Sequence, residues 1–277
     1  MARFRYAYNS FSYYGEEIAR SIERVAGFGY DAIELVGEPE HYDAARIREL
    51  AANAGIAVSS VSSMYTAERD LCHPDRAKRR EAVDYVRSVA DLAAAAGAAT
   101  IIVAPSAVMK TTRLGASADE WGWAIESIRA GGEYAASLGV DVSLEPWNRY
   151  ETYFLNRLEQ AVELWHATGL QNGGVMGDTF HMSIEEASIP DALRAAGSLL
   201  NHVHLADSNR AVAGLGHTDF RPILQALVDV DYRGYLSFEV MAPSGDPMRI
   251  PAGAGPESFD ADTKQAIEHM KAIEQTL

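Results

Sequence analysis

Along its whole length the chain alternates between short apolar segments and longer segments in which apolar residues recur at helical spacing. The segment after the first apolar stretch shows the second pattern, with Ile18, Ile22 and Val25 three or four positions apart. Glycines such as Gly55 and Gly97 follow the helical segments, a placement typical of helix ends. Regular alternation of strands and helices predicts a parallel sheet covered by helices, which is the α/β class.

The alternation predicts eight strand–helix units. Strands are predicted over residues 4–8, 32–36, 56–61, 98–104, 140–145, 174–178, 200–206 and 235–240. Helices are predicted over residues 16–26, 44–54, 74–96, 118–138, 157–168, 184–196, 222–228 and 257–276, the sixth interrupted by a proline. Eight such units in 277 residues close most economically into a (β/α)8 TIM barrel.

No linker-like segment or change of composition divides the chain, so we expect a single barrel domain over residues 1–277. The competing fold is an open, doubly wound sheet. That fold usually carries a glycine-rich nucleotide-binding turn after its first strand. Here the turn reads Asn9-Ser10-Phe11-Ser12 and contains no glycine, which favours the barrel.

Charge and cysteine content exclude several kinds of partner and of structural site. The 24 Lys and Arg against 39 Asp and Glu give a net charge of −15. Nucleic acids and anionic membranes both attract basic surfaces, so we expect neither as a partner. Cys72 is the only cysteine, which excludes an intrachain disulfide and a cysteine-based zinc site. Because residues 1–15 lack the apolar core of a secretory signal and residues 92–104 are too few to span a bilayer, we expect a cytoplasmic protein.

The carboxyl ends of the barrel strands carry the active site in this fold. Four consecutive predicted strands each present one metal-competent side chain there, namely Glu145, Asp178, His204 and Glu239. Taken singly, Asp178 is typical of a helix N-cap, His204 of a hydrogen-bonded interior histidine, and the glutamates of ion pairs with a nearby arginine. Four on adjacent strands favour a metal site instead. Three carboxylates and one imidazole suit Mn²⁺, Mg²⁺ or Co²⁺ better than a structural Zn²⁺.

These residues and their surroundings resemble the ketose 3-epimerases, the family of D-tagatose 3-epimerase, D-allulose (D-psicose) 3-epimerase and L-ribulose 3-epimerase within the xylose-isomerase-like TIM barrels. The resemblance covers essentially the whole chain. Its most specific parts are the segments from Glu145 to Glu151, from Gly177 to His181 and from His202 to Arg210, followed by Glu239.

The resemblance implies a role for each matching residue. Glu145, Asp178, His204 and Glu239 would hold a divalent metal, with Mn²⁺ preferred and Mg²⁺ or Co²⁺ as alternatives. Glu145 and Glu239 would also be the catalytic acid/base pair. Glu151, His181 and Arg210 would bind the O1 to O3 end of a ketose. The resemblance further implies a homodimer or homotetramer. The sequence itself shows no motif for a hydride-carrying cofactor, so no cofactor-binding residues are predicted.

Elementary chemistry agrees with that reading. The C3 hydrogen of a ketose is weakly acidic, and a divalent metal at neighbouring sugar oxygens would stabilise the enediolate formed when it is removed. Inversion at C3 needs a second group on the opposite face, which a pair of glutamates could supply. We therefore expect C3 epimerisation of a free ketose, such as D-fructose/D-allulose, D-tagatose/D-sorbose or L-ribulose/L-xylulose. A phosphorylated sugar is disfavoured because no lysine lies between Lys110 and Lys264.

Three other functions remain alternatives at this point. An aldose–ketose isomerase of the same barrel family, similar to hydroxypyruvate isomerase, would use a similar metal set. An apurinic-site endonuclease of the same superfamily would need more histidines for several metal ions and a basic surface for DNA, which the net charge disfavours. A non-catalytic sugar-binding barrel would have no need of both glutamates.

Further residues near the predicted site are expected to have supporting roles. Glu34 ends the second strand, where a structural salt bridge under the site is the preferred interpretation, and His202 lies one layer deeper than His204 by strand alternation. Cys72 has no predicted base beside it and is expected to be an inert thiol. The side chains that could line the far end of the sugar are Tyr65, Met109, Trp147 and Met241.

Overall fold

Eight parallel strands form a closed barrel in which each strand pairs with the next along the chain and the last pairs with the first. The computed structural model describes residues 4–13, 15–241 and 256–277. The strands are β1 (Arg5–Asn9), β2 (Ala32–Gly37), β3 (Ala57–Ser63), β4 (Thr100–Val103), β5 (Asp141–Leu144), β6 (Gly173–Asp178), β7 (Leu200–Leu205) and β8 (Tyr235–Phe238). The predicted (β/α)8 TIM barrel is confirmed.

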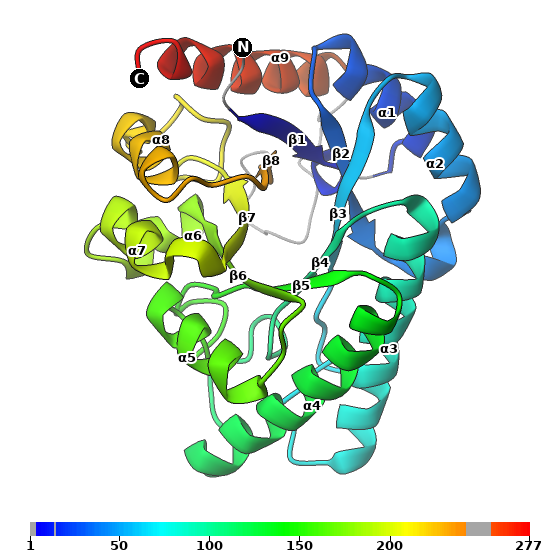
Figure 1. Ribbon diagram of the computed structural model, residues 1–277, viewed down its shortest axis with the longest axis vertical. Coiled ribbons are helices and arrows are strands. Elements are labelled where there is room, and N and C mark those ends of the chain that lie inside the picture. Colours follow the sequence, from blue (N-terminus) through cyan, green and yellow to red (C-terminus); the bar gives the residue numbers. More distant parts are fainter. Residues whose placement is uncertain (1–3, 14, 242–255) are drawn as a thin grey trace.

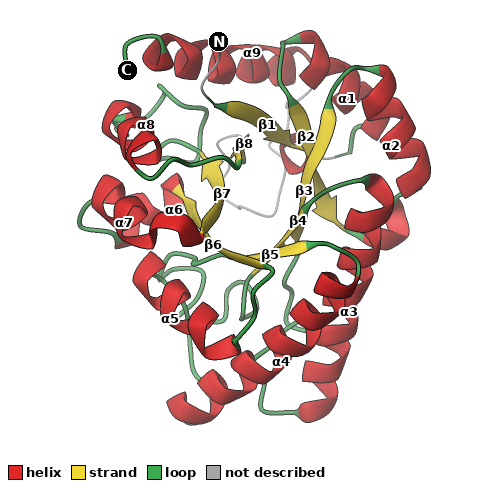
Figure 2. Ribbon diagram, in the orientation of Figure 1, coloured by secondary structure: helices red, strands yellow, loops and turns green. Residues whose placement is uncertain are grey.

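Helices surround the barrel on its outside (Figures 1 and 2). They are α1 (Ile18–Gly27), α2 (Ala44–Asn53), α3 (Arg76–Ala96), α4 (Ser117–Ser137), α5 (Leu158–Thr168), α6 (Thr179–Glu185), α7 (Ile189–Ala196), α8 (Phe220–Asp229) and α9 (Pro256–Glu274). Short 3₁₀ turns occur at Ser10–Tyr13, Pro39–His41 and Gly197–Leu199. None of the helices in these described ranges is both long and apolar enough to cross a membrane.

Local chemistry explains where the elements end. The helices α3 and α5 are each followed by a glycine in the left-handed region, Gly97 with φ 83° and Gly169 with φ 72°, a conformation that other residues adopt at a cost. Strand β4 is shorter than the predicted segment 98–104, because Ala98 and Ala104 at the two ends of that segment are buried without pairing to the neighbouring strands. Apolarity therefore marks burial here rather than the length of the strand.

The sixth helical segment differs from the prediction. Instead of one interrupted helix over residues 184–196, the chain forms α6 directly after β6 and then α7. Asp178 caps α6 by accepting from the backbone N–H of Phe180 and of His181. Ser188 caps α7, and Pro190 lies in its first turn, where a missing N–H costs nothing. The proline thus marks the start of a second helix, and the cap brings α6 up to the carboxyl end of the barrel.

Candidate metal centre and active site

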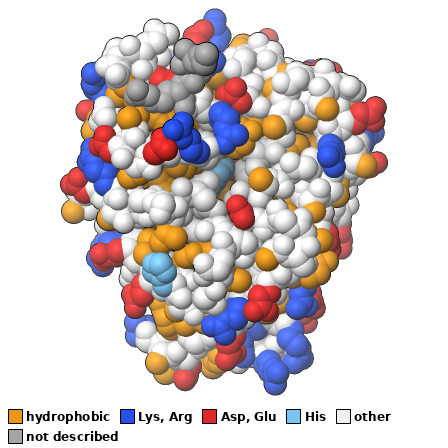
Figure 3. Space-filling model, in the orientation of Figure 1, with side chains coloured by type: hydrophobic (Ala, Val, Ile, Leu, Met, Phe, Trp, Pro, Cys, Tyr) orange, Lys and Arg blue, Asp and Glu red, His pale blue; other side chains and the backbone are white. Residues whose placement is uncertain are grey.

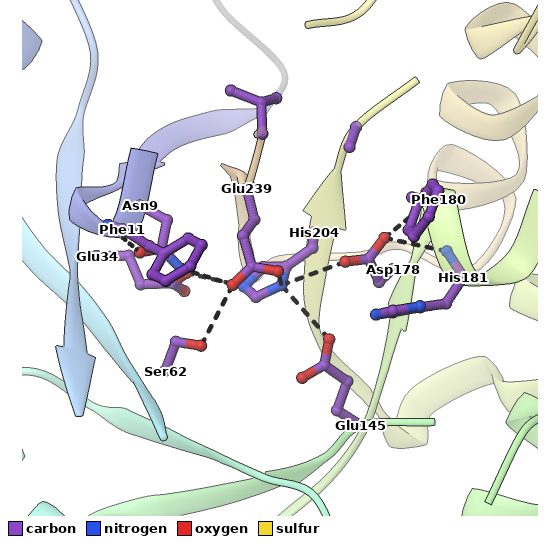
Figure 4. Close-up of polar contacts among 12 residues, drawn as sticks. Asn9, Phe11, Glu34, Ser62, Glu145, Asp178, Phe180, His181, His204 and Glu239 are labelled. Carbon is purple, nitrogen blue, oxygen red and sulfur yellow. Dashed lines mark hydrogen bonds and ion pairs between the residues drawn. The ribbon is translucent and has the colours of Figure 1, made fainter. Parts of the chain in front are cut away.

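The four side chains predicted as metal ligands meet at the carboxyl end of the barrel (Figure 4). Asp178 is the last residue of β6, His204 lies near the end of β7 and pairs with it in register, and Glu145 and Glu239 directly follow β5 and β8. One ligand-type atom from each lies within 4.8 Å of all the others. We call Glu145, Asp178, His204 and Glu239 the carboxylate–histidine cluster.

His204 Nδ1 is the atom on which the cluster converges. It lies 3.3 Å from Glu239 Oε2, 3.7 Å from Glu145 Oε1 and 3.7 Å from Asp178 Oδ2. Within the described part of the chain, this buried nitrogen and the buried Glu145 Oε1 have no hydrogen-bond partner. Buried polar atoms are nearly always satisfied, so two such atoms facing one point are typical of a place for an ion. The cluster could hold a divalent metal ion, and its mostly oxygen donors suit a hard one.

Asp178 both caps a helix and faces the cluster. Its Oδ1 accepts from Phe180 N at 2.8 Å and from His181 N at 3.4 Å, while its Oδ2 points toward His204 and Arg210. Burial alone would raise the pKa of Asp178, but the charges of Arg210 and His181 hold that pKa well below its usual range. The helix-cap interpretation is therefore right for one oxygen, and the other remains available as an ionised ligand.

The side chain of Arg210 is not free to move in the cavity, because it is paired with members of the cluster. Its guanidinium forms ion pairs with Asp178 and with Glu239, two members of the cluster. The side chain is only 11% exposed, and the backbone has a φ of 64°, which is uncommon for a residue other than glycine. Arg210 is thus held directly beside the cluster as its counter-ion.

The loop between β7 and α8 is shaped around Asp207. This buried carboxylate accepts from the backbone N–H of Ser208, Gly214 and Thr218 at 2.7–2.9 Å. A Cβ at Gly216 would lie 2.3 Å from Asp207 Oδ1, so the loop can close around the carboxylate only with a glycine there. The loop carries Arg210, whose N–H in turn donates to the carbonyl of Asp207. Sequence reasoning missed this role of Asp207.

Glu151 and His181 are linked by a residue that sequence reasoning also missed. Asn148 Nδ2 donates to Glu151 Oε1 at 2.8 Å and lies 2.8 Å from His181 Nδ1, while the latter two atoms are 4.0 Å apart. Asn148 lies within the segment from Glu145 to Glu151 that follows β5, and this position is the one signal in the sequence that could have indicated its role.

A cavity of about 240 Å³ brings the predicted residues together. Its walls include Glu145 and Glu239 of the cluster and all three residues predicted to bind the ketose, Glu151, His181 and Arg210. The four side chains predicted for the far end of the sugar, Tyr65, Met109, Trp147 and Met241, line it as well. Further lining residues that were not predicted include Phe11, Ser62, Val108, Phe180 and Asn209.

A buried carboxylate, that of Glu34, lies beneath the cluster inside the barrel. Glu34 lies within β2 rather than at its end, 2.8 Å from His204 Nε2 and 2.8 Å from His202 Nε2. Burial opposes ionisation of Glu34, but the neighbouring His204 and His202 keep its pKa well below its usual range. The structure places a carboxylate–histidine contact under the site, where the sequence predicted a salt bridge. Cys72 is buried, and burial raises the pKa of its thiol, as expected of an inert cysteine.

Comparison with known proteins agrees with this geometry. The sequence matches the family described as Xylose isomerase-like TIM barrel over residues 22–273. It is 32% identical over 269 residues to a D-psicose 3-epimerase of Ruminiclostridium cellulolyticum, covering 91% of this chain and 90% of that protein. It is 30% identical over 224 residues to an L-ribulose 3-epimerase of Mesorhizobium japonicum, covering 80% and 75% of the two chains.

A solved structure is similar over almost the whole chain. The crystal structure of D-psicose 3-epimerase with D-tagatose from Clostridium cellulolyticum H10 has a TM-score of 0.88 and 29% sequence identity, covering 98% of this chain and 99% of that one. The chain belongs to the xylose isomerase-like TIM barrel family and, within it, to the ketose 3-epimerases.

Proposed function

We propose that this protein is a metal-dependent isomerase that epimerises a free ketose at C3. The observation that carries the proposal is the convergence of two glutamates, Glu145 and Glu239, on one buried cluster at the wall of a sugar-sized cavity. They follow two different strands, so they can reach a substrate from two directions (Figure 4). The family relationship supports this proposal, because the relatives named above are 3-epimerases of ketoses.

The carboxylate–histidine cluster would hold the metal ion through Glu145, Asp178, His204 and Glu239. A divalent cation there would polarise the ketose carbonyl and offset the negative charge that develops when C3 loses its proton. Mn²⁺ is the preferred candidate, with Mg²⁺ and Co²⁺ as alternatives, because the donors are mostly carboxylate oxygens. The two buried atoms without hydrogen-bond partners, His204 Nδ1 and Glu145 Oε1, support this assignment.

Proton transfer at C3 falls to the two glutamates. One carboxylate would remove the C3 proton from one face of the sugar, and the other, in its acid form, would return a proton to the opposite face. Burial opposes ionisation of Glu239, but His204 and Arg210 lower its pKa and so favour the ionised form, which is the form that can accept a proton. In the reverse direction the two glutamates would exchange roles.

Arg210, His181 and Glu151 would hold the O1 to O3 end of the ketose. All three line the cavity that contains both glutamates, and they offer a guanidinium, an imidazole and a carboxylate for hydroxyl and carbonyl oxygens. Positioning of this kind lowers the barrier because the C3 hydrogen is presented to the base in a fixed orientation. The apolar walls at Val108, Met109 and Trp147 would face the rest of the carbon chain.

A free sugar is favoured over a sugar phosphate by the charges of the cavity. Among the described lining residues, Arg210 is the only lysine or arginine, and its guanidinium is already paired with two carboxylates. A phosphate group would add about −2 charge beside Glu145 and Glu239, and no unpaired lysine or arginine among the described lining residues could bind it. On the face of the molecule seen in Figure 3, basic and acidic side chains are interspersed, which gives no support to binding of a polyanion such as DNA.

The test is an assay of the Mn²⁺-loaded protein with D-fructose, D-allulose, D-tagatose and L-ribulose, with the products separated by chromatography. We expect the C3 epimer of at least one ketose and no aldose. An aldose as the main product would establish the aldose–ketose isomerase alternative instead. Sedimentation of the same sample would test the homodimer or homotetramer that the family resemblance implies.

A further inference from the structure

Glu34 lies on the far side of His204 from the carboxylates of the cluster and is completely buried (Figure 4). Its Oε1 is 2.8 Å from His204 Nε2 and accepts from Asn9 Nδ2 at 2.7 Å. Its Oε2 accepts from Ser60 Oγ at 2.5 Å and lies 2.8 Å from His202 Nε2. Hydrogen bonds from Asn9, Ser60 and His204 thus meet on one carboxylate, and a carboxylate in such a setting acts as an acceptor only.

The distances from Glu34 to His202 and His204 are too short for these residues to bind a second metal ion between them. Glu34, His202 and His204 together present ligand-type atoms near one another. Two ligands of one ion at about 2.0–2.2 Å from it lie roughly 3 Å or more apart. The 2.8 Å separation between Glu34 Oε1 and His204 Nε2 is that of a direct hydrogen bond, and His202 Nε2 lies equally near Glu34 Oε2. Glu34 therefore contacts the imidazole of His204 directly, with no metal ion between them.

The first consequence concerns the tautomer of His204. Because Glu34 accepts, His204 Nε2 must carry a hydrogen. In the neutral ring, the form that binds a metal, the lone pair is then on Nδ1. Nδ1 is the atom that faces Glu145, Asp178 and Glu239. Glu34 thus selects which ring nitrogen is offered to the cluster and fixes the plane of the ring.

The second consequence concerns Glu239. Asn9 Nδ2 donates both to Glu34 Oε1 at 2.7 Å and to Glu239 Oε1 at 3.0 Å. That contact holds one oxygen of Glu239 toward Asn9 and leaves the other, Oε2, 3.3 Å from His204 Nδ1. A single carboxylate therefore orients a metal-ligand histidine directly and a proton-transferring glutamate through one amide.

We propose that Glu34 is a positioning residue of the metal centre, which sets His204 as an Nδ1 ligand and, through Asn9, orients the carboxylate of Glu239. This inference rests on the proposed metal-dependent function. Groups that orient metal-ligating histidines in this way contribute on the order of 10- to 100-fold to metal affinity.

The variant that tests the proposal is Glu34→Gln, which keeps the size of the side chain. A glutamine has one oxygen and one NH₂ group. In either orientation its NH₂ would therefore face groups that donate hydrogen bonds to Glu34 in the wild-type protein. Turned toward His204 it would force the hydrogen onto Nδ1 and remove the ligand atom. Turned toward Ser60 and His202 it would spare His204 but still remove the negative charge that polarises the ring.

The matched control is Glu120→Gln. Glu120 is also completely buried, and it accepts from Leu114 N at 2.9 Å and Gly115 N at 3.2 Å, in contact with Tyr153 and away from the cluster. Both variants lose a buried carboxylate, so a general loss of stability would appear in both. Only Glu34→Gln should change the metal centre.

The measurement is the Kd for Mn²⁺, obtained from the electron paramagnetic resonance signal of free Mn²⁺ during titration of the folded proteins. We expect Glu34→Gln to raise the Kd by on the order of 10- to 100-fold, and Glu120→Gln to leave it within about twofold because distant sites act independently. A folded Glu34→Gln protein with the wild-type Kd would overturn this inference alone. Wild-type protein that binds no Mn²⁺ would overturn the proposed metal-dependent function, and the inference with it.

A second measurement needs no variant and decides the matter if Glu34→Gln does not fold. In wild-type protein labelled with ¹⁵N-histidine and loaded with diamagnetic Mg²⁺, two-bond ¹H–¹⁵N correlations report the tautomer of each ring. We expect His204 with a protonated Nε2 and an unprotonated Nδ1. A hydrogen on Nδ1 in the metal-loaded protein would overturn the proposal.

Discussion

The ion pairs of Arg210 predict an unusual response to its removal. In the structure its guanidinium contacts Asp178 and Glu239, so it balances two carboxylates that the proposed metal would also balance. Arg210→Met keeps much of the length of the side chain and removes its charge. We therefore expect the variant to depend on the metal for its stability more than the wild-type protein does.

The size of the effect follows from burial. The side chains of Arg210, Glu239 and Asp178 are 11%, 13% and 0% exposed. Breaking a buried ion pair by removing one partner costs about 3–5 kcal/mol, and the neighbouring cavity favours the lower end of that range. At ~2–4 °C per kcal/mol for a chain of this size, a cost of about 3 kcal/mol should make the metal-free variant melt roughly 6–12 °C below the wild type.

Added metal should reverse that loss. A cation bound by Asp178 and Glu239 compensates both carboxylates in the variant, whereas in the wild type it must compete with the guanidinium. We expect Mn²⁺ to raise the Tm of Arg210→Met by more than it raises that of the wild type, and the Kd for Mn²⁺ to fall by on the order of 10-fold, since ~1.4 kcal/mol corresponds to a factor of ten. Turnover of the ketose should nevertheless decrease, because Arg210 is proposed to bind the substrate.

Thermal unfolding with and without Mn²⁺ tests this reasoning, and Arg149→Met is the matched control. Arg149 pairs with Glu185, but its side chain is 62% exposed and screened by solvent, so its loss should change the Tm little with or without metal. Equal Tm gains from Mn²⁺ in wild type and Arg210→Met would refute the idea that the guanidinium and the metal balance the same carboxylates.

Three further predictions follow from the site. Verified removal of divalent metal by a chelator should abolish turnover, and Mn²⁺ or Co²⁺ should restore it; full turnover by the metal-free protein would contradict the proposed role of the cluster. Gly216→Ala should lower kcat/KM, because its Cβ would lie 2.3 Å from Asp207 Oδ1 and displace the loop of Arg210, whereas Gly27→Ala, with nothing within 4 Å, should not; equal effects would contradict this account. Burial opposes ionisation of Asp207, but backbone N–H donors led by that of Thr218 lower its pKa. Ionised Asp207 therefore stabilises the fold at pH values above the unfolded pKa of about 3.9. This stability is lost as the pH falls through the lower pKa of the folded state. Asp207→Asn should therefore flatten the acid limb of the stability curve, measured by urea unfolding between about pH 2 and 5.

Much of this architecture could be predicted from the sequence, because its cause is local. Apolar strands and helical periodicity repeat eight times, glycines follow most of the helical segments, and a barrel is the closure that buries the apolar faces. Topology then places the residues at the strand ends together, which is why Glu145, Asp178, His204 and Glu239 could be named before their distances were known. The start of α6 was missed because it depends on a cap by Asp178, whose polar character was attributed to a ligand.

Contacts between distant segments could not be predicted in the same way. Asn9 and Glu239 are 230 residues apart in the chain, yet their side chains share a hydrogen bond. The pairing of Arg210 with Asp178 and Glu239 depends on the path of a loop that Asp207 holds by its backbone N–H groups. Periodicity and residue type carry no information on such paths, so the supporting residues emerged only from the structure.

The measurement that tests the central claim most directly is the position of solvent deuterium in the sugar. Ketose is incubated in D₂O with the Mn²⁺-loaded wild type, Glu145→Gln or Glu239→Gln, and the carbon that carries deuterium is identified by NMR. We expect deuterium at C3 of the epimer with the wild type. Each variant should lose epimerisation by about 10²–10⁴-fold, while exchanging C3 of opposite epimers. Deuterium at C1, or one variant that epimerises at the wild-type rate, would contradict C3 epimerisation by two glutamates.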